Sequence, residues 1–581
     1  MIKIRSLAQR MFFLPASLLV LLLGCALALP ARQPAQDKDD RHESDDEHEG
    51  PRCRQKPSHI DDPSQPGHHH VSKTSYNLPS TITITATENG STTTDTNVHL
   101  WAVVYYPGIS SAPNAPVAPG HHPLVVYLHG NHGIWIDSSG NHTCGPPTAT
   151  PVPNHEGYNY ILERLASHGI IAVSINANDL NCKGGRIVAR GKLILHHLGL
   201  WKDWNDPAKP DPTFGGRFHK HVDMNRVGLA GHSRGGEGIV SAYLENQSSG
   251  LGFGIKAVHS ISPVDFDAFT LADVPYYVLM GAADGDVWDL QGARIYDRAA
   301  PRTNAHKMPK MQSFLYGANH NWFNTVWFQD EGWPSFGPNR ITDVQQRAVE
   351  RAMGTAFFRE YLEGLGAAHS LFTGDAVLLT LAPAKFYRSF QDPAHLTVDD
   401  FEDAPPNPLL NSLGGANSNV SLSPFAEFPF SEFGGAFNNT FFQDTHGLIS
   451  GWNAAGTEFI LDVPAANKDV TAYRYFSFRV TQVFDSGALN PIGQTEDFDI
   501  GLEDVNGNRI YLEVGQFDTI PFSYDRPGGN ASMLQTIRLG LPCFRCTGFA
   551  GLDIHAIAKI HFRFNRKPTG LVGLDDVQFS R

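Results

Sequence analysis

Short apolar runs alternate with helical patterns over the first two thirds of the chain. Residues 81–86 alternate between apolar and polar positions, which is typical of a strand with one exposed face, and residues 98–106 form a second strand. Continuous apolar runs of the buried kind follow at residues 124–128, 170–175, 226–230, 257–261, 276–280 and 312–316. Helical spacing appears at residues 160–168, 186–200 and 342–362. This alternation predicts an α/β domain with a doubly wound, mostly parallel sheet and an antiparallel edge at its start.

The pattern changes after about residue 396. Short strand patterns are separated by Gly, Asn, Pro or Asp, and no long helical pattern intervenes. These strands are expected at residues 459–463, 473–480, 498–502, 509–514, 534–539, 559–564 and 571–579. The second part of the chain is therefore predicted to be an all-β sandwich domain.

Composition places boundaries around these two domains. The 581 residues exceed what one core usually holds, at about 150 residues per domain. Residues 29–72 are rich in Pro, Asp, Glu and His and poor in apolar side chains, which predicts a disordered acidic linker. The expected organisation is a signal peptide at 1–28, this linker, an α/β domain at 73–395 and the β-sandwich at 396–581. The net charge of −14 argues against a nucleic-acid partner.

The first residues have the pattern of a secretory signal. Lys3, Arg5 and Arg10 precede an apolar run over residues 11–23, and Gly24 and Cys25 follow. The segment around Cys25 resembles a bacterial lipoprotein box, in which the cysteine is lipidated. The alternative is cleavage after residue 28 without a lipid. We expect a secreted or cell-envelope protein, with membrane attachment only through a lipid anchor.

Export permits disulfide bonds. Cys543 and Cys546 are close enough in sequence to clamp a small loop, and Cys144 and Cys182 could pair across loops above the sheet. A redox or zinc CxxC is the rival interpretation of the first pair. Cys53 would then be left over.

Candidate chemistry begins at a G-x-S-x-G motif over residues 231–235, with Ser233 at its centre. The motif directly follows the strand pattern 226–230, and a helix can start after it. Such a strand–turn–helix elbow lifts the serine hydroxyl clear of the sheet, which predicts that Ser233 is a nucleophile.

A serine nucleophile needs a base and an acid downstream. His320 follows the strand pattern 312–316 and is the expected base. Asp284 follows the strand pattern 276–280 and is the expected acid, which orients the imidazole. Asp286 in the same loop is the rival for this role. Asp265 and Asp267 follow an earlier strand and are less favoured.

An oxyanion hole needs two backbone N–H groups. The residue after the nucleophile, Arg234, is expected to supply one. Asn131, in the loop after strand 124–128, is expected to supply the other, with His132 as the alternative. The Arg234 side chain is expected to pair with Glu237 one helical turn on, or to meet an anionic substrate.

The order Ser233, Asp284, His320, together with His129-Gly130, resembles the α/β-hydrolase superfamily over about residues 95–365. The segments 231–236 and 317–324 resemble secreted bacterial polyester hydrolases and platelet-activating-factor acetylhydrolases. The resemblance implies ester hydrolysis through an acyl-enzyme without a cofactor. Residues 398–402 and 573–579 resemble the opening and closing strands of carbohydrate-binding or galactose-binding-like jelly-roll domains.

We therefore expect a secreted serine hydrolase of small-molecule or polymeric esters, in which the C-terminal domain contacts a glycan or polymer. Two alternatives stay open. One is a peptidase or transacylase on the same triad, and the other is a non-catalytic surface protein that binds through its β-sandwich. Neither the zinc-protease nor the phosphate-loop pattern occurs, so no metal site is expected.

Overall fold

The structure, a computed structural model, describes residues 60–145, 150–299, 308–331, 340–381, 384–432, 439–441, 443–483, 487–491, 493–520, 524–526, 529–545 and 551–581. The expected signal peptide, with Cys25, and most of the expected linker lie outside these residues. The first strand already begins at His70, three residues before the expected boundary. In the described part of the chain, every helix is too short or too polar to cross a membrane.

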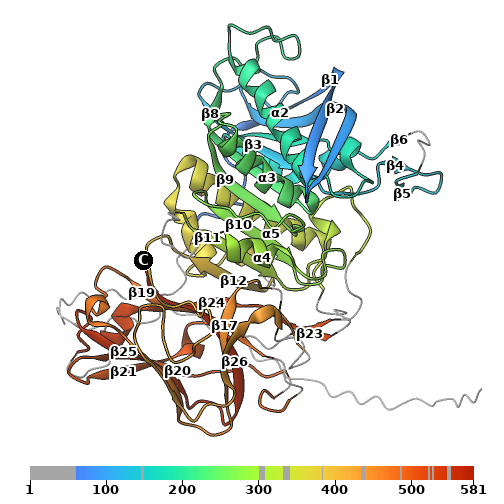
Figure 1. Cartoon of the computed structure of the whole chain (residues 1–581). Coiled ribbons are helices and arrows are strands. Elements are labelled where there is room, and N and C mark those ends of the chain that lie inside the picture. The colour runs from blue at the N-terminus through green and yellow to red at the C-terminus, as the bar shows by residue number, and fades with distance from the viewer. Residues whose placement is uncertain are drawn as a thin grey trace, which may run out of the picture. The chain divides into compact units, whose positions relative to one another are not determined.

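A nine-stranded sheet forms the first part (Figure 1). Its spatial order is β1 (His70–Glu88), β2 (Ser91–Gly108), β7 (Ile171–Ile175), β3 (His122–Leu128), β8 (Val222–His232), β9 (Ile255–Ile261), β10 (Tyr276–Gly281), β11 (Lys310–Leu315) and β12 (Phe386–Gln391). The strands from β7 to β11 run parallel, while β1, β2 and β12 pair antiparallel at the two edges. The predicted mixed, mostly parallel sheet is therefore confirmed.

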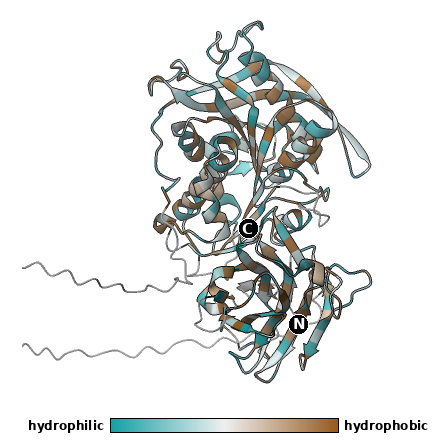
Figure 2. Cartoon of the chain, turned by 90° about the vertical axis from the view of Figure 1, so that its left-hand side faces the viewer, coloured by the Kyte–Doolittle hydropathy of each residue, from teal (hydrophilic) through white to brown (hydrophobic). Residues whose placement is uncertain are grey.

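Alternate residues of the central strand β3 pack into two different cores. Leu124 and Val126 belong to one apolar cluster, whereas Val125 and Tyr127 belong to another on the opposite face. Because both faces are buried, the strand is continuously apolar in sequence. Figure 2 shows hydrophobic colour along the central strands of this sheet.

Helices cover both faces of the sheet. The first cluster includes residues of α2 (Ile187–Asn205), α3 (Arg234–Ser248) and α4 (Gly292–Arg298). The second includes residues of α1 (Asn159–Ser167), α5 (Asp343–Phe358) and α6 (His369–Thr373). Short helical turns complete the layer at η1 (Asn154–Tyr158), η2 (Asn178–Leu180), η3 (Asn321–Phe323), η5 (Arg359–Glu363), η6 (Gly366–Ala368) and η7 (Leu379–Leu381).

The helix α5 shows how far local pattern determines structure. Thr342 caps it, and Thr342 and Gln345 form the expected reciprocal capping box. The helix was expected to run to residue 362, but its α-helical part ends at Phe358. A π-helical turn, η5, continues the chain to Gly364, whose φ of 75° ends the helix in the left-handed region.

A small lobe follows β3. It is a three-stranded sheet of two-residue strands, β4 (Trp135–Ile136), β5 (His142–Thr143) and β6 (Thr150–Pro151). The predicted disulfide between Cys144 and Cys182 is formed, with the two Cα atoms 5.6 Å apart, and it joins this lobe to the segment after η2. Cys543 is buried, whereas Cys53 and Cys546 lie outside the described residues.

The C-terminal part is a β domain, as predicted, and its two larger sheets are antiparallel. One sheet contains β15 (Phe425–Pro429), β17 (His446–Trp452), β26 (Gly570–Ser580), β19 (Tyr475–Gln482) and β24 (Gln535–Gly540), with β13 (His395–Asp399) also paired to β26. The other contains β14 (Asn417–Val420), β18 (Thr457–Asp462), β25 (Ile557–Phe564), β20 (Asp499–Asp504) and β21 (Arg509–Glu513). A third small sheet contains β16 (Asn439–Phe441), β23 (Gly529–Ser532) and β22 (Tyr524–Arg526).

The two larger sheets share one apolar core. Phe476 on β19 and Phe562 on β25 belong to the same cluster, and their ring centroids are 6.3 Å apart. Contact between aromatic side chains of facing sheets is typical of a β-sandwich. Residues 398–402 and 573–579, matched as opening and closing strands in the sequence, overlap β13 and β26, which pair antiparallel.

A buried arginine connects the β domain to the α/β domain. Arg479 on β19 is 2 % exposed, and its Nη1 lies 3.1 Å from Asp297 Oδ1 on α4 and 3.0 Å from Asp575 Oδ2 on β26. Nearby, Ser389 Oγ on β12 donates to the Leu534 carbonyl oxygen at 2.9 Å. The strands β19 and β26 are buried on both faces because one side packs on the sandwich core and the other faces these contacts.

Replacing Arg479 with methionine is expected to lower the free energy of unfolding by about 3–5 kcal/mol, because buried carboxylates would lose their counter-charge. Urea unfolding monitored by tryptophan fluorescence measures the loss. Lys209→Met, at an ion pair with Asp203 in which both side chains are more than half exposed, serves as the control and is expected to cost less than about 1 kcal/mol. Equal stabilities of the two variants would contradict the role of Arg479.

Candidate active site

Ser233 occupies the sharp turn between β8 and α3. Its backbone has φ 58° and ψ −127°, a sparsely populated conformation for a residue with a side chain. A Cβ at Gly235 would collide with the Leu128 carbonyl oxygen, so the turn has room only for glycine there. The G-x-S-x-G motif thus lies on a strained strand–turn–helix elbow, and the Ser233 side chain is 2 % exposed.

Asp284 and His320 meet although they are 36 residues apart in sequence. The Nδ1 atom of His320 lies 2.7 Å from Asp284 Oδ2, and both side chains are almost fully buried. The other carboxylate oxygen of Asp284 accepts hydrogen bonds from the backbone N–H groups of Asp286 and Val287, at 3.0 and 2.7 Å. Hydrogen bonds within the loop after β10 therefore orient the Asp284 carboxylate toward the imidazole of His320.

Asp286 faces the other nitrogen of the same ring. Its Oδ2 atom is 3.4 Å from His320 Nε2, and its side chain is 56 % exposed. The two rival carboxylates of the sequence therefore contact opposite edges of one imidazole. Asp265, the less favoured candidate, forms an ion pair with Arg298 instead.

The charge around His320 favours the imidazolium. Burial lowers its pKa, but the negative charge of Asp284, its hydrogen bond and the charge of Asp286 outweigh that effect and raise the pKa of His320 to about 9. A histidine in this environment is a strong base once it is neutral.

Ser233 directly follows β8, and His320 lies in the loop after β11. The ring of His232, next to Ser233, contacts the ring of His320. The His232 ring centroid is 4.8 Å from that of His320 and 4.8 Å from that of Trp327. Tyr158 shares a 3.0 Å hydrogen bond with His232 Nδ1. Within the described residues, the Ser233 hydroxyl forms no hydrogen bond to His320. Such contacts are often loose without substrate.

The loop after β3 packs directly on Ser233. A Cβ at Gly130 would collide with the Ser233 side chain, so these two segments touch. His129 anchors the loop: Nε2 accepts from the Ala177 N–H at 2.8 Å, which leaves Nδ1 to donate to the Gly130 carbonyl at 2.8 Å. The buried Arg190 also donates to the His129 carbonyl oxygen at 3.1 Å.

The two expected oxyanion donors lie on this loop and at the start of α3. Asn131 is held by its side chain, whose Oδ1 accepts from the Cys182 N–H at 2.7 Å. Among the described residues, neither the Asn131 nor the Arg234 backbone N–H donates a hydrogen bond. Both therefore remain available to a ligand beside Ser233. The side chain of His132, the alternative, stacks on Trp327 at 4.7 Å.

The expected pair between Arg234 and Glu237 is wrong. The Arg234 guanidinium donates to the Lys183 carbonyl oxygen at 2.6 Å and lies 5.8 Å from the Phe266 ring centroid. Glu237 is buried and accepts from the backbone N–H groups of Phe266 and Asp267, at 2.9 and 2.7 Å. The two side chains are one helical turn apart, but Arg234 binds the backbone of the segment before α2 and Glu237 binds the backbone of the loop after β9.

Sequence reasoning missed four residues that surround the site, namely Arg190, His232, Tyr158 and Trp327. Of these, His232 carried a usable signal because it lies inside the G-x-S-x-G motif. The others come from helices or loops whose sequence pattern does not show what they contact.

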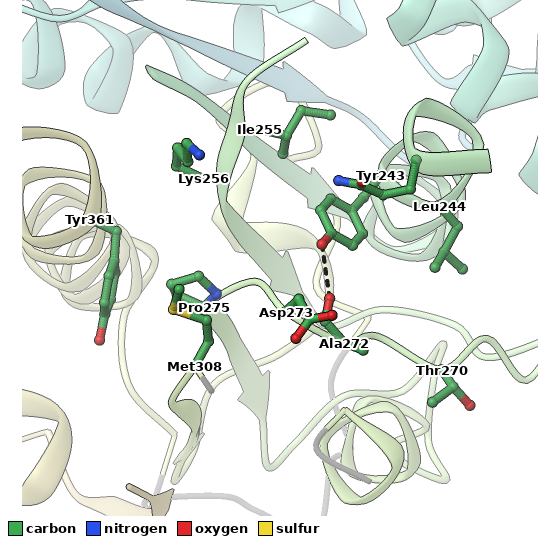
Figure 3. Close-up of a pocket in the computed structure, with 11 residues that line it drawn as sticks. Tyr243, Leu244, Ile255, Lys256, Thr270, Ala272, Asp273, Pro275, Met308 and Tyr361 are labelled. Atoms are coloured by element: carbon green, nitrogen blue, oxygen red, sulfur yellow. Dashed lines mark hydrogen bonds between the residues drawn. The ribbon is translucent and has the colours of Figure 1, made fainter. Parts of the chain in front are cut away.

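A cavity of about 620 Å³ lies elsewhere (Figure 3). It is lined by Ile255 at the start of β9 and Pro275 just before β10, and Tyr243 donates to the Ala272 carbonyl oxygen at 2.8 Å. These positions are at the amino ends of the parallel strands, whereas Ser233, Asp284 and His320 follow the carboxyl ends. Ligands of open α/β sheets bind at the carboxyl ends, so this cavity is separate from the candidate site.

Comparisons with known proteins do not assign the chain to a family. No protein-family model matches the chain, and no curated protein matches it in sequence. Within the described residues, no group of three or more His, Cys, Asp or Glu side chains is arranged to hold a metal ion.

Proposed function

We propose that this protein is a serine hydrolase of the α/β-hydrolase type that cleaves carboxylic esters. The observation that carries the proposal is the 2.7 Å contact between His320 Nδ1 and buried Asp284, at the sheet edge where Ser233 sits on a strained elbow. Ser, Asp and His in this chain order, each after a parallel strand, form the α/β-hydrolase triad. The resemblance to polyester and platelet-activating-factor acetyl hydrolases remains part of the proposal.

In the proposed reaction, Ser233 Oγ attacks the ester carbonyl while its proton passes to neutral His320. The backbone N–H groups of Asn131 and Arg234 stabilise the negative oxygen of the tetrahedral intermediate. The imidazolium then gives the proton to the leaving alcohol, and an acyl-enzyme forms. Water, deprotonated by His320, attacks the acyl group, which releases the acid and restores Ser233. Asp284 holds the imidazole in the required tautomer throughout.

Labelling with a fluorophosphonate tests the proposal. The full chain is expected to form a covalent adduct on Ser233, which peptide mass spectrometry locates. A panel of p-nitrophenyl esters and matched anilides then separates esterase from peptidase activity. Absence of the adduct would favour a non-catalytic binding protein, and faster cleavage of the anilides would favour a peptidase.

We also propose that the protein works outside the cytoplasm. The Cys144–Cys182 disulfide supports this location because such bonds persist in oxidising compartments. Lipidation of Cys25 and glycan or polymer contact by the β domain stay predictions, since the structure describes neither the lipid signal nor a bound ligand.

The exposed Asp286 is expected to set the pH dependence. Neutral His320 is the active base, so kcat/KM should rise as pH passes through about 9, the pKa of His320. Asp286→Asn removes an anion that favours the imidazolium, and the pKa should fall. The acidic limb of the profile should then move down by about half to one pH unit, allowing for solvent screening.

Hydrolysis of p-nitrophenyl acetate between pH 6 and 10 measures this shift. Asp289→Asn is the matched control, because that carboxylate lies in the same loop but pairs with Arg294 at 3.0 Å. A limb that stays in place in Asp286→Asn would show that Asp286 does not act on His320.

A further inference from the structure

A second cavity lies on the same edge of the sheet as the candidate site. It has a volume of about 250 Å³, and its lining includes Trp101 on β2, Trp135 on β4 and Asp179 on η2. The backbone N–H of Asn176, one residue past β7, donates to the Trp101 carbonyl oxygen, which puts Trp101 at the carboxyl end of β7. The strands β2, β7, β3 and β8 are consecutive, so Trp101 is about 14 Å from the end of β8.

Aromatic faces and polar groups line this cavity together. Two indoles contribute apolar surface, and His99, Asp179 and Asn77 contribute polar side chains. Neither indole N–H, nor the side-chain amide of Asn77, has a hydrogen-bond partner among the described residues. The cavity therefore offers both donors and acceptors beside flat apolar faces. A sugar ring, with apolar C–H faces and hydroxyl groups at its rim, matches that combination.

The carboxylate in the cavity lining, Asp179, is hydrogen-bonded to a neighbour in the same lining. Asp179 Oδ2 is already engaged by the backbone N–H of His99, at 2.8 Å, and by His99 Nδ1, at 3.0 Å. The ammonium group of Lys183 is 2.9 Å from Asp95 Oδ1 and also donates to the Asp179 carbonyl oxygen.

The cavity is also joined to the candidate oxyanion loop by a short, constrained segment. Asn178 and Asp179 line the cavity, and Cys182, three residues on, donates its backbone N–H to Asn131 Oδ1. The disulfide from Cys182 to Cys144 ties the same segment to the lobe that carries Trp135. A substrate held in the cavity would thus be positioned by the elements that hold the oxyanion loop.

We propose that this cavity is a subsite for a neutral sugar ring of the substrate, so that the enzyme acts on esterified oligosaccharides. The inference rests on the proposed ester hydrolysis at Ser233. The separation of about 14 Å means that the subsite binds a ring remote from the reacting ester. Binding energy from such a remote part lowers KM when it is the same in the ground and transition states.

Steady-state kinetics of the full chain with two acetate esters test the subsite. Trp135→Ala is expected to raise KM for acetylated cellotetraose about tenfold, equivalent to about 1.4 kcal/mol, with kcat nearly unchanged. For p-nitrophenyl acetate, which has no sugar, kcat/KM should not change. Trp135→Phe retains an aromatic face and should restore most of the lost affinity. Phe428→Ala, at an exposed aromatic residue of the β domain, should leave kcat and KM unchanged for both substrates.

A binding measurement separates this inference from the proposed function. Isothermal titration calorimetry of unmodified cellotetraose with full-length Ser233→Ala is expected to show binding that the added Trp135→Ala change weakens about tenfold. Unchanged affinity after Trp135→Ala, or no binding in Ser233→Ala, would overturn the subsite even if p-nitrophenyl acetate is hydrolysed. If the wild-type chain hydrolyses neither ester, the proposed function fails, and calorimetry alone decides the sugar subsite.

Discussion

Ser233→Ala is expected to reduce kcat for p-nitrophenyl acetate by a factor of about 10⁴ or more. Alanine keeps the Cβ atom at the strained turn but removes Oγ, the only atom of this side chain that could form the acyl bond. Because the Ser233 hydroxyl has no hydrogen bond to His320 in the described residues, its loss should not disturb the fold. Spectrophotometric assays of purified protein measure the loss, and circular dichroism checks the fold.

The matched control is Ser248→Ala, at the exposed end of the same helix α3. That variant should have the activity of the wild-type chain and the same fluorophosphonate adduct. Turnover by Ser233→Ala within tenfold of the wild-type rate would remove Ser233 from the mechanism, and with it the proposed acyl-enzyme.

Asp284→Asn is expected to lower kcat by about 10⁴, the second largest effect. An amide in this position can present its N–H₂ to His320 Nδ1, which would stabilise the tautomer with the proton on Nε2. That tautomer cannot accept the serine proton. Asparagine keeps one oxygen to accept the N–H groups of Asp286 and Val287, so the loop should hold its shape.

Asp286→Asn provides the comparison, because it removes a carboxylate from the opposite side of the same ring. Measured above pH 9, its kcat should stay within about tenfold of the wild-type value, since Nδ1 keeps its partner. A larger loss in Asp286→Asn than in Asp284→Asn would transfer the orienting role to Asp286. The two variants together therefore decide which carboxylate is the acid of the triad.

Much of the α/β domain could be predicted from local pattern. A strand buried on both faces is a continuous apolar run, so β3, β7 and β10 are visible in the sequence without any knowledge of their neighbours. The edge strand β12 (Phe386–Gln391) was missed, because only its last three residues are buried and its sequence lacks such a run.

The chain order of the candidate site was also accessible to sequence reasoning. Ser233, Asp284 and His320 each follow a strand pattern, and parallel strands bring their carboxyl ends to one edge. The contact between Asp284 and His320 confirms that these two loops meet. Catalysis by the three residues remains to be tested.

What the sequence by itself determined is the central strands and main helices of the α/β domain and the residues that follow each of these strands, because periodicity and turn chemistry are local. Only the tertiary structure decided the partners. It distinguished Asp284 on Nδ1 from Asp286 near Nε2, gave Arg234 a backbone carbonyl instead of Glu237, and brought Trp101 and Trp135 to one cavity. Each of these contacts joins segments far apart in the chain, and their distances follow from strand order and loop packing, which no local pattern encodes.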